Sequence, residues 1–115
     1  MIKTLAVLCL LATPMTFTLG KSFKLVPGEA ASGAGLTLRL EGYGHKIDMD
    51  RRDLAFVSVQ LEVGTEKQSM RFFREGTPEP IQWKGYEVRM TACDDQGPPH
   101  SSTAASTFVV TKIKP

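Results

Sequence analysis

The side chains of this chain that are best suited to transition-metal chemistry are two histidines, at 45 and 100, and two cysteines, at 9 and 93. Imidazole and thiolate groups are ligands that zinc and copper ions favour. A blue-copper centre places its second histidine and a methionine shortly after the cysteine. Here six residues separate Cys93 from His100, and no methionine follows His100. The metal hypothesis that remains is a site made by His45 and His100 with nearby carboxylates or Cys93.

Three carboxylates follow His45, at Asp48, Asp50 and Asp53. Several hard oxygen ligands of this kind could gather a calcium ion, but an EF-hand loop starting at Asp48 needs glycine where Asp53 stands. Cations are interspersed with these acids at Lys46, Arg51 and Arg52. We therefore interpret the segment as a solvated charged loop and predict no metal ligands in it.

Nucleophilic catalysis would have to use Cys93 with His100. Asp94 and Asp95 follow the cysteine directly and disfavour its thiolate form. No G-x-S-x-G or H-E-x-x-H motif is present. We expect no enzymatic activity, no catalytic residue and no cofactor.

The aromatic residues favour a binding surface instead. Phe72 and Phe73 are adjacent in an extended run, so their side chains must point to opposite faces and only one can be core. Phe56 is out of register with the apolar positions around it, and two arginines flank the phenylalanine pair in a manner that suits an interface rim. The predicted binding residues are Phe56, Phe72, Phe73, Arg71 and Arg74.

The sequence pattern predicts that the elements which position these residues are strands. Apolar and polar residues alternate over residues 36–41, 55–63 and 86–92, and shorter runs occupy 22–26, 68–73, 80–83 and 106–113. Turn-forming glycine and proline separate them. Only residues 29–32 and 48–53 leave room for a helical turn, and residues 42–53 and 94–103 are the longest irregular segments. About seven strands predict an all-β, antiparallel two-sheet sandwich, with a small β-barrel as the alternative.

The N-terminus has the pattern of a secretory signal peptide. Lys3 precedes an apolar run over residues 5–12, Pro14 ends it, and Thr18 and Gly20 fit the −3 and −1 positions of a cleavage site. We predict a signal peptide over residues 1–20 and a single domain over residues 21–115. The alternative is an uncleaved anchor. We expect an exported protein, periplasmic or secreted, with no membrane insertion beyond this segment.

The charge of the chain is close to neutral, at +2, which argues against nucleic acid as a partner. After processing, Cys93 would be the one remaining cysteine, so it is either inert or a route to a disulfide-linked dimer.

Residues 85–92 (GYEVRMTA), followed by Asp94, Gly97, Ser101 and residues 107–111, resemble the last two strands of fibronectin type III and related Ig-like sandwich domains. In that family a Y-x-V-x-V-x-A strand leads through a polar loop into the final strand. Phe23, Leu25, Gly28 and Glu29 are similar to the opening segment of small secreted bacterial β-sandwich domains. Both resemblances imply a fold more than an activity.

The reading we favour is an exported, non-enzymatic binding or structural module that engages another extracytoplasmic protein. It would use a strand edge, its loops, or the surface around Phe56, Phe72 and Phe73. The alternative is an exported metal-binding protein that uses His45 and His100.

Overall fold

The computed structural model describes residues 15–47, 49–50, 53–74, 78–95, 100 and 102–113, and for residue 53 the backbone alone. These residues form strands and turns, with no helix among them. Accordingly, this described part of the chain holds no helix long and apolar enough to cross a membrane. The strands are β1 (Met15–Thr16), β2 (Phe23–Leu25), β3 (Ala30–Gly33), β4 (Leu36–Ile47), β5 (Asp53–Val63), β6 (Glu66–Phe73), β7 (Ile81–Trp83), β8 (Tyr86–Cys93) and β9 (Ser106–Lys112).

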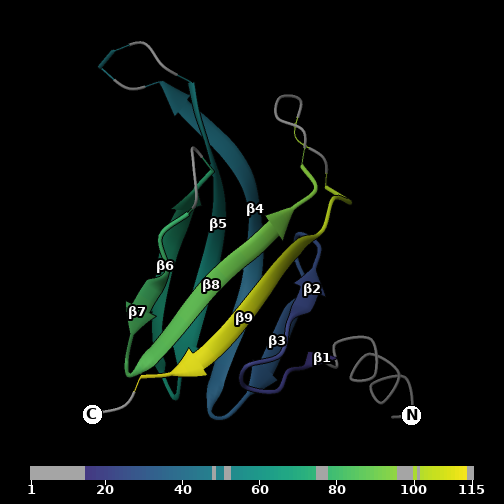
Figure 1. Cartoon of the computed structure of the whole chain (residues 1–115), viewed down its shortest axis with the longest axis vertical. Coiled ribbons are helices and arrows are strands. Elements are labelled where there is room, and N and C mark those ends of the chain that lie inside the picture. The colour runs from purple at the N-terminus through teal and green to yellow at the C-terminus, as the bar shows by residue number, and fades with distance from the viewer. Residues whose placement is uncertain are drawn as a thin grey trace, which may run out of the picture.

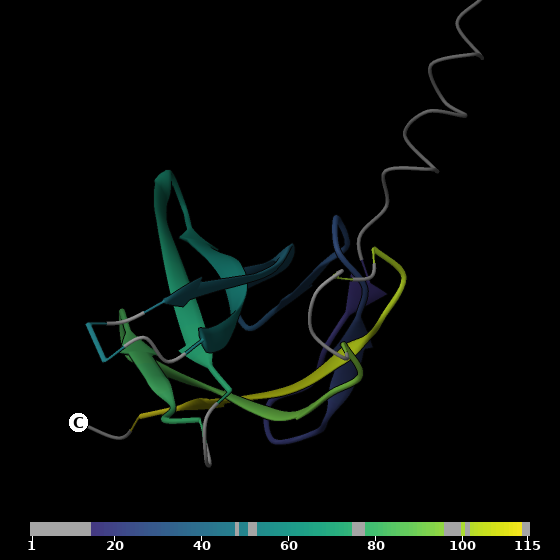
Figure 2. The same ribbon diagram turned by 90° about the horizontal axis from the view of Figure 1, so that it is seen from above.

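The strands form two sheets that face each other (Figures 1 and 2). One sheet has the order β1-β3-β4-β5-β6 and the other has the order β2-β9-β8-β7. All pairs are antiparallel except β1 with β3. The chain is thus all-β with two sheets, as predicted, and the described strands do not close into the barrel that was the alternative.

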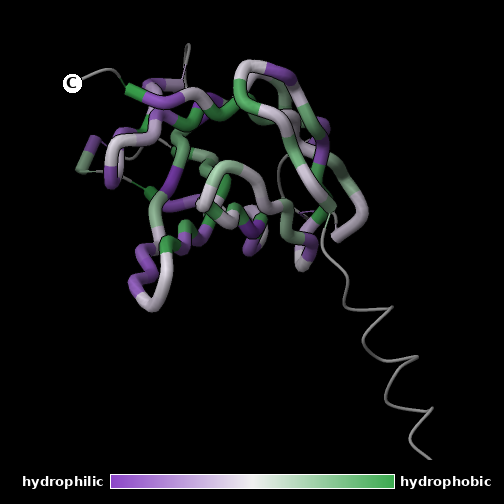
Figure 3. The backbone as a smooth tube through the Cα atoms, turned by 90° about the horizontal axis from the view of Figure 1, so that it is seen from below, coloured by the Kyte–Doolittle hydropathy of each residue, from purple (hydrophilic) through white to green (hydrophobic). Residues whose placement is uncertain are grey.

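The core lies between the two sheets. Leu36, Leu38 and Leu40 of β4 are buried, as the alternation predicted, and they share one apolar cluster with Val88 and Val110 of the opposite sheet. Hydrophobic and hydrophilic positions alternate along the strands (Figure 3). Aromatic contacts link the layers, since the rings of Phe72 and Phe108 lie 6.0 Å apart. Burial of these side chains is the main stabilising contribution to such a fold.

A β-bulge changes the alternation in the middle of β4. The register with β5 shifts between Leu40 and Gly42, so Glu41 is an extra residue on that strand. Beyond the bulge, Tyr43 pairs with Val57, which is buried in the core, and His45 pairs with Ala55 two residues further on. Directly opposed residues share a face of the sheet. The bulge therefore turns Tyr43 and His45 toward the second sheet.

A second bulge, between Met90 and Ala92, has the same effect on β8. Ala92 was predicted to continue the buried face after Met90, and that prediction is wrong: Ala92 is exposed, and Cys93 packs against the core instead. The extra residue reverses which side chains point inward.

Two predictions about irregular segments are also wrong. Residues 29–32 were expected to allow a helical turn, but residues 30–33 form β3, paired with β4. Residues 42–53 were expected to be irregular, yet β4 and β5 pair from Gly42 with Ser58 out to Ile47 with Asp53. The part of β4 and β5 beyond the bulge, residues 42–47 and 53–57, is called the arm below; it extends past the end of β8 (Figure 1). Residues 48, 51 and 52, and the side chain of residue 53, lie outside the described residues, so the predicted helical turn over 48–53 stays a prediction.

The segment before β2 is part of the packed fold. Phe17 is buried, its ring stacks on Phe23 at 4.9 Å, and its N–H donates to the Ser32 carbonyl. A Cβ on Gly33 would lie 2.4 Å from the Phe17 carbonyl oxygen, so glycine is needed for this close approach. Residues 1–14 lie outside the described residues. The predicted cut after Gly20 stays a prediction, and it would remove Phe17 from the core.

Candidate functional site

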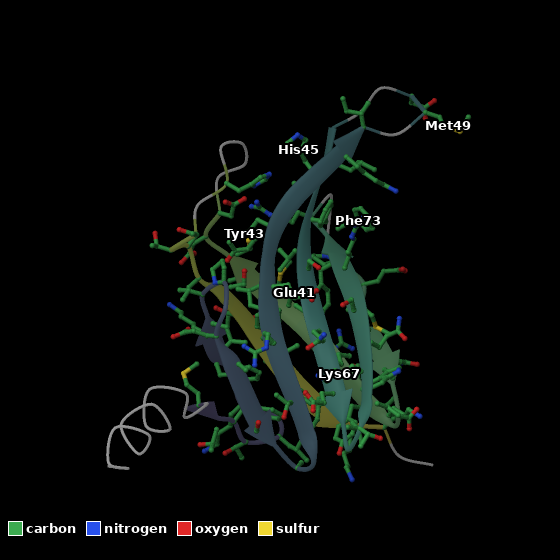
Figure 4. The ribbon with its side chains drawn as sticks, turned by 180° about the vertical axis from the view of Figure 1, so that it is seen from behind. Glu41, Tyr43, His45, Met49, Lys67 and Phe73 are labelled. Atoms are coloured by element: carbon green, nitrogen blue, oxygen red, sulfur yellow. The ribbon has the colours of Figure 1, made fainter. Side chains whose placement is uncertain are left out.

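The arm and the segment after β8 meet at one end of the molecule, and both histidines lie there. His45 sits on the arm, above Tyr43 on the same strand (Figure 4). Its Nδ1 atom lies 3.0 Å from Nε2 of His100. The two residues that the sequence offered as metal ligands are therefore brought together across the two sheets.

A buried carboxylate orients this histidine pair. The Oδ2 atom of Asp95 accepts a hydrogen bond from Nδ1 of His100 at 2.8 Å, and Asp95 is only 1% exposed. The guanidinium of Arg74 lies 3.6 Å from the same oxygen. An ionised carboxylate only accepts hydrogen bonds, so Nδ1 of His100 carries a proton and Nε2 presents its lone pair to His45. For neutral rings, Nδ1–H of His45 then donates to it.

Tyr43 fixes the segment that returns to β9. Its hydroxyl donates to the Ala104 carbonyl at 2.6 Å and lies 3.0 Å from Oγ of buried Ser106. Burial raises the pKa of Tyr43 above its usual value; the hydrogen bond with Ser106 opposes this, and the charges of Cys93, Asp95 and Asp94 add to it. Tyr43 therefore remains a neutral donor at physiological pH and anchors this end of the site.

The outer face of the five-stranded sheet carries a different group of side chains. Phe56 and Phe73 are cross-strand neighbours whose rings meet edge to face at 5.9 Å. Arg71 lies over the Phe56 ring at 4.1 Å, and Lys46 over the Phe73 ring at 5.3 Å. These four residues are called the outer aromatic surface below. Such cation–aromatic contacts hold a cationic and apolar surface in a defined arrangement.

Gly44 makes room for this surface. It is paired with Phe56, and a Cβ at that position would lie 2.6 Å from the tip of the Phe56 ring. The tip of the ring consequently lies against the backbone of β4 at Gly44, an approach that a side chain there would prevent. Phe73 remains 37% exposed beside it.

The structure divides the five predicted binding residues. Phe56, Phe73 and Arg71 share the outer face, whereas Phe72 is 1% exposed and belongs to the core. The prediction that only one of the two adjacent phenylalanines could be core is confirmed. Arg74 pairs with Asp95 rather than flanking the aromatic rings, because it lies one residue past the end of β6.

Cys93 is half-buried against the core. It contributes, with Arg74 and Met90, to a pocket of about 160 Å³ at the end of β8. No group of three or more histidine, cysteine, aspartate or glutamate residues that could hold a metal occurs in the part of the chain that the structure describes. Disulfide-linked dimerisation through Cys93 stays a prediction.

Among the strands that the structure describes, β6 is the last of its sheet and pairs with β5 alone. Val63 and Glu66 close the turn between them, and the N–H of Arg74 donates to the Ala55 carbonyl at 2.9 Å. In β6, the even-numbered residues therefore direct their N–H and C=O groups toward β5, and the odd-numbered residues direct theirs away from it. The outward-directed positions are Lys67, Ser69, Arg71 and Phe73.

Comparison with known proteins gives no assignment: no protein family matches the chain, and no curated protein or solved structure is significantly similar to it.

Sequence reasoning missed the contacts of Asp95 and Arg74 in the histidine cluster, and it missed the hydrogen bonds of Tyr43 to the segment before β9. Asp95 was considered only for its effect on Cys93, and Arg74 only as a rim residue. The available signal was the proximity of Asp95 to His100 in sequence, which allows a short turn to bring a carboxylate onto an imidazole. The approach of His45, on β4, to His100 depends on the bulge at Glu41, and no local sequence pattern indicated that bulge.

Proposed function

We propose that the chain is exported after loss of its N-terminal signal segment and acts as a non-enzymatic binding module with an Ig-like β-sandwich fold. It takes an extended segment of another extracytoplasmic protein as an additional strand along β6. The observation that carries this proposal is the outward-directed edge of β6 beside the outer aromatic surface. Strand addition supplies affinity through main-chain hydrogen bonds and specificity through alternate side chains.

The edge is long enough for strand addition. β6 spans eight residues and ends the sheet, and four of its residues direct N–H and C=O groups away from β5. Unpaired edges of this kind are templates for another chain. Lys67 lies near one end of the edge and Phe73 at the other (Figure 4). A charged residue such as Lys67 also discourages indiscriminate edge pairing.

The side chains along this edge define the occupant. Lys67 and Arg71 are exposed cations, and Phe73 is an exposed aromatic ring on the same outer face. A paired strand places its own outward side chains about 4.5–5.5 Å from these residues. The partner segment that fits is extended, with acidic residues opposite Lys67 and Arg71 and an apolar residue opposite Phe73.

A proline at an outward position tests the edge directly. Ser69→Pro removes an N–H that makes no bond to β5, so the sheet should remain intact. The matched control, Ser69→Ala, removes only the hydroxyl that donates to Glu41 at 3.3 Å and keeps the N–H. The probe is a fluorescein-labelled extended peptide of alternating glutamate and phenylalanine, and binding is followed by anisotropy. We expect Ser69→Pro to weaken binding at least about tenfold, or 1.4 kcal/mol, and Ser69→Ala to leave it unchanged.

Substitutions of the two adjacent phenylalanines distinguish binding along the β6 edge from binding on the outer face of the sheet. Phe73→Ser should fold and lose affinity, whereas Phe72→Ser should lower the melting temperature strongly, because Phe72 is core. Equal binding by Ser69→Pro and the parent chain would overturn strand addition. Binding that is lost in Phe73→Ser and retained in Ser69→Pro would place the partner on the outer face instead of on the edge.

A further inference from the structure

The two histidines of this chain meet each other although nothing in the strand edge of β6 requires it. The chain has no other histidine. Their facing nitrogens lie 3.0 Å apart, and the rings are inclined by 38°. His45 is exposed and His100 is 19% exposed, so the pair is open to solvent and to small ions.

The carboxylate behind His100 has the arrangement found behind metal-binding histidines. Such histidines usually donate their second ring N–H to a carboxylate, which fixes the tautomer and strengthens the ligand nitrogen. Asp95 does this here at 2.8 Å and is itself buried. The Nε2 atom that would bind the ion is consequently held toward His45 before any ion arrives.

We propose that His45 and His100 bind one divalent transition-metal ion of the zinc, copper or nickel class, through Nδ1 of His45 and Nε2 of His100. Imidazole nitrogens are preferred ligands of these ions. Two nitrogens bound at about 2.0–2.1 Å lie about 2.9 Å apart on adjacent corners of a square and about 3.4 Å apart on a tetrahedron. The observed 3.0 Å separation of the two nitrogens falls within that range, so the rings must turn toward a common ion but need not move apart.

Binding changes the tautomer of His45. In the ion-free neutral pair, Nδ1–H of His45 joins the two facing nitrogens. When the ion takes its place, that proton leaves Nδ1 and Nε2 of His45 takes one up from solvent, so both imidazoles stay neutral and no net proton is released. No redox change is involved. The negative charge of Asp95 favours the cation, and Arg74, 3.6 Å from the same carboxylate oxygen, opposes it. Lys46 is the neighbouring cation on the arm, and its side chain extends over Phe73 on the opposite face.

Because the described residues offer no third histidine, cysteine or carboxylate in a common group, the remaining coordination positions belong to water or to a group supplied from outside. The ion would tie the arm to the segment after β8. The site is thus an open surface site, distinct from a closed structural one.

Metal titration of the chelator-treated full chain tests this inference. Zinc, copper(II) and nickel(II) salts are added separately, and binding is followed by calorimetry and thermal unfolding. We expect one ion per chain and a rise in melting temperature with at least one of the three. His45→Ala and His100→Ala should each lower the affinity at least tenfold, with no further loss in the double variant. Asp95→Asn should weaken it about 10–100-fold.

Lys46→Ala is the matched control, since it lies beside His45 but faces away, and its metal affinity should equal that of the parent chain. If a histidine variant fails to fold, the ring signals of the parent chain decide the matter by nuclear magnetic resonance. Zinc should shift the signals of both histidines, and copper(II) should broaden them. Unchanged ring signals, or equal affinity in the folded double variant, would refute the site. Neither result bears on strand addition, because that proposal is tested separately by Ser69→Pro, which changes neither histidine.

Discussion

Nε2 of His100 lies 3.0 Å from Nδ1 of His45, although the two residues are 55 positions apart in the sequence. The contact joins the arm to the segment that follows β8. It forms because the bulge at Glu41 turns His45 toward the second sheet and because Asp95 holds the His100 ring in place. Buried Asp95 thereby gives exposed His45 and half-buried His100 a defined relative geometry.

The buried carboxylate should be important for stability. Asp95→Asn removes the charge that pairs with Arg74 and weakens the acceptor for His100. We expect a loss of about 1–3 kcal/mol in the free energy of unfolding, measured by urea denaturation, because buried partners are left imperfectly satisfied. Glu79→Gln at an exposed position is the control and should stay within about 0.5 kcal/mol of the parent chain. Equal stability of the two variants would contradict a structural role for Asp95.

Tyr43 should give the chain a pH dependence in the alkaline range. Burial raises the pKa of Tyr43 in the folded state above its unfolded value. Its contribution is therefore complete below about pH 10, the ordinary tyrosine value, and is lost as the pH rises through the folded pKa. Tyr43→Phe should cost about 0.5–1.5 kcal/mol at pH 8 through the lost hydrogen bonds.

The difference in the free energy of unfolding between Tyr43→Phe and the parent chain should decrease as the pH is raised above 10. Urea unfolding at several pH values measures both proteins, and Tyr86 is common to the two. A gap that stays constant over this range would show that Tyr43 does not titrate differently in the two states.

The predicted cleavage after Gly20 should lower the stability of the fold. A chain beginning at Met15 keeps Phe17 in the core, and a chain beginning at Lys21 does not. We expect the shorter chain to be less stable by about 3 kcal/mol, the cost of removing a buried phenylalanine. Leu19→Ala in the longer chain is the control, because Leu19 is 37% exposed, and it should have little effect.

Gly33→Ala in the longer chain should reproduce part of the loss, since the added Cβ would displace Phe17. If the chains that begin at Met15 and at Lys21 have the same melting temperature, the packing of Phe17 contributes nothing to stability. The mass of the protein isolated from cells that express the full chain identifies the N-terminus that the cell produces.

The alternating segments of the sequence predicted most of the strands, because a strand buried on one face needs an apolar residue at every second position. Leu36, Leu38 and Leu40 lie in the core as that rule requires. The rule failed where one residue was inserted. Thr91 is the extra residue in β8, so Ala92 is exposed. β3 was missed because its short run AASG has no alternation to detect.

For the candidate sites, the residue types were visible but the groupings were not. Adjacent Phe72 and Phe73 had to face opposite ways, and the structure assigns Phe72 to the core. Arg71 and Arg74 looked equivalent in the sequence. They differ because Arg71 lies on the outer face of β6, whereas Arg74 lies beyond its end and reaches Asp95.

The sequence by itself determined the all-β class and the composition of the core, since both follow from local spacing of apolar side chains and turn residues. Only the tertiary structure decided that His45 meets His100, that Phe56 lies over Gly44, and that β6 ends its sheet. These relationships depend on bulges and on strand order. Both are set by how distant segments pack, and the spacing of residues along one strand does not encode them.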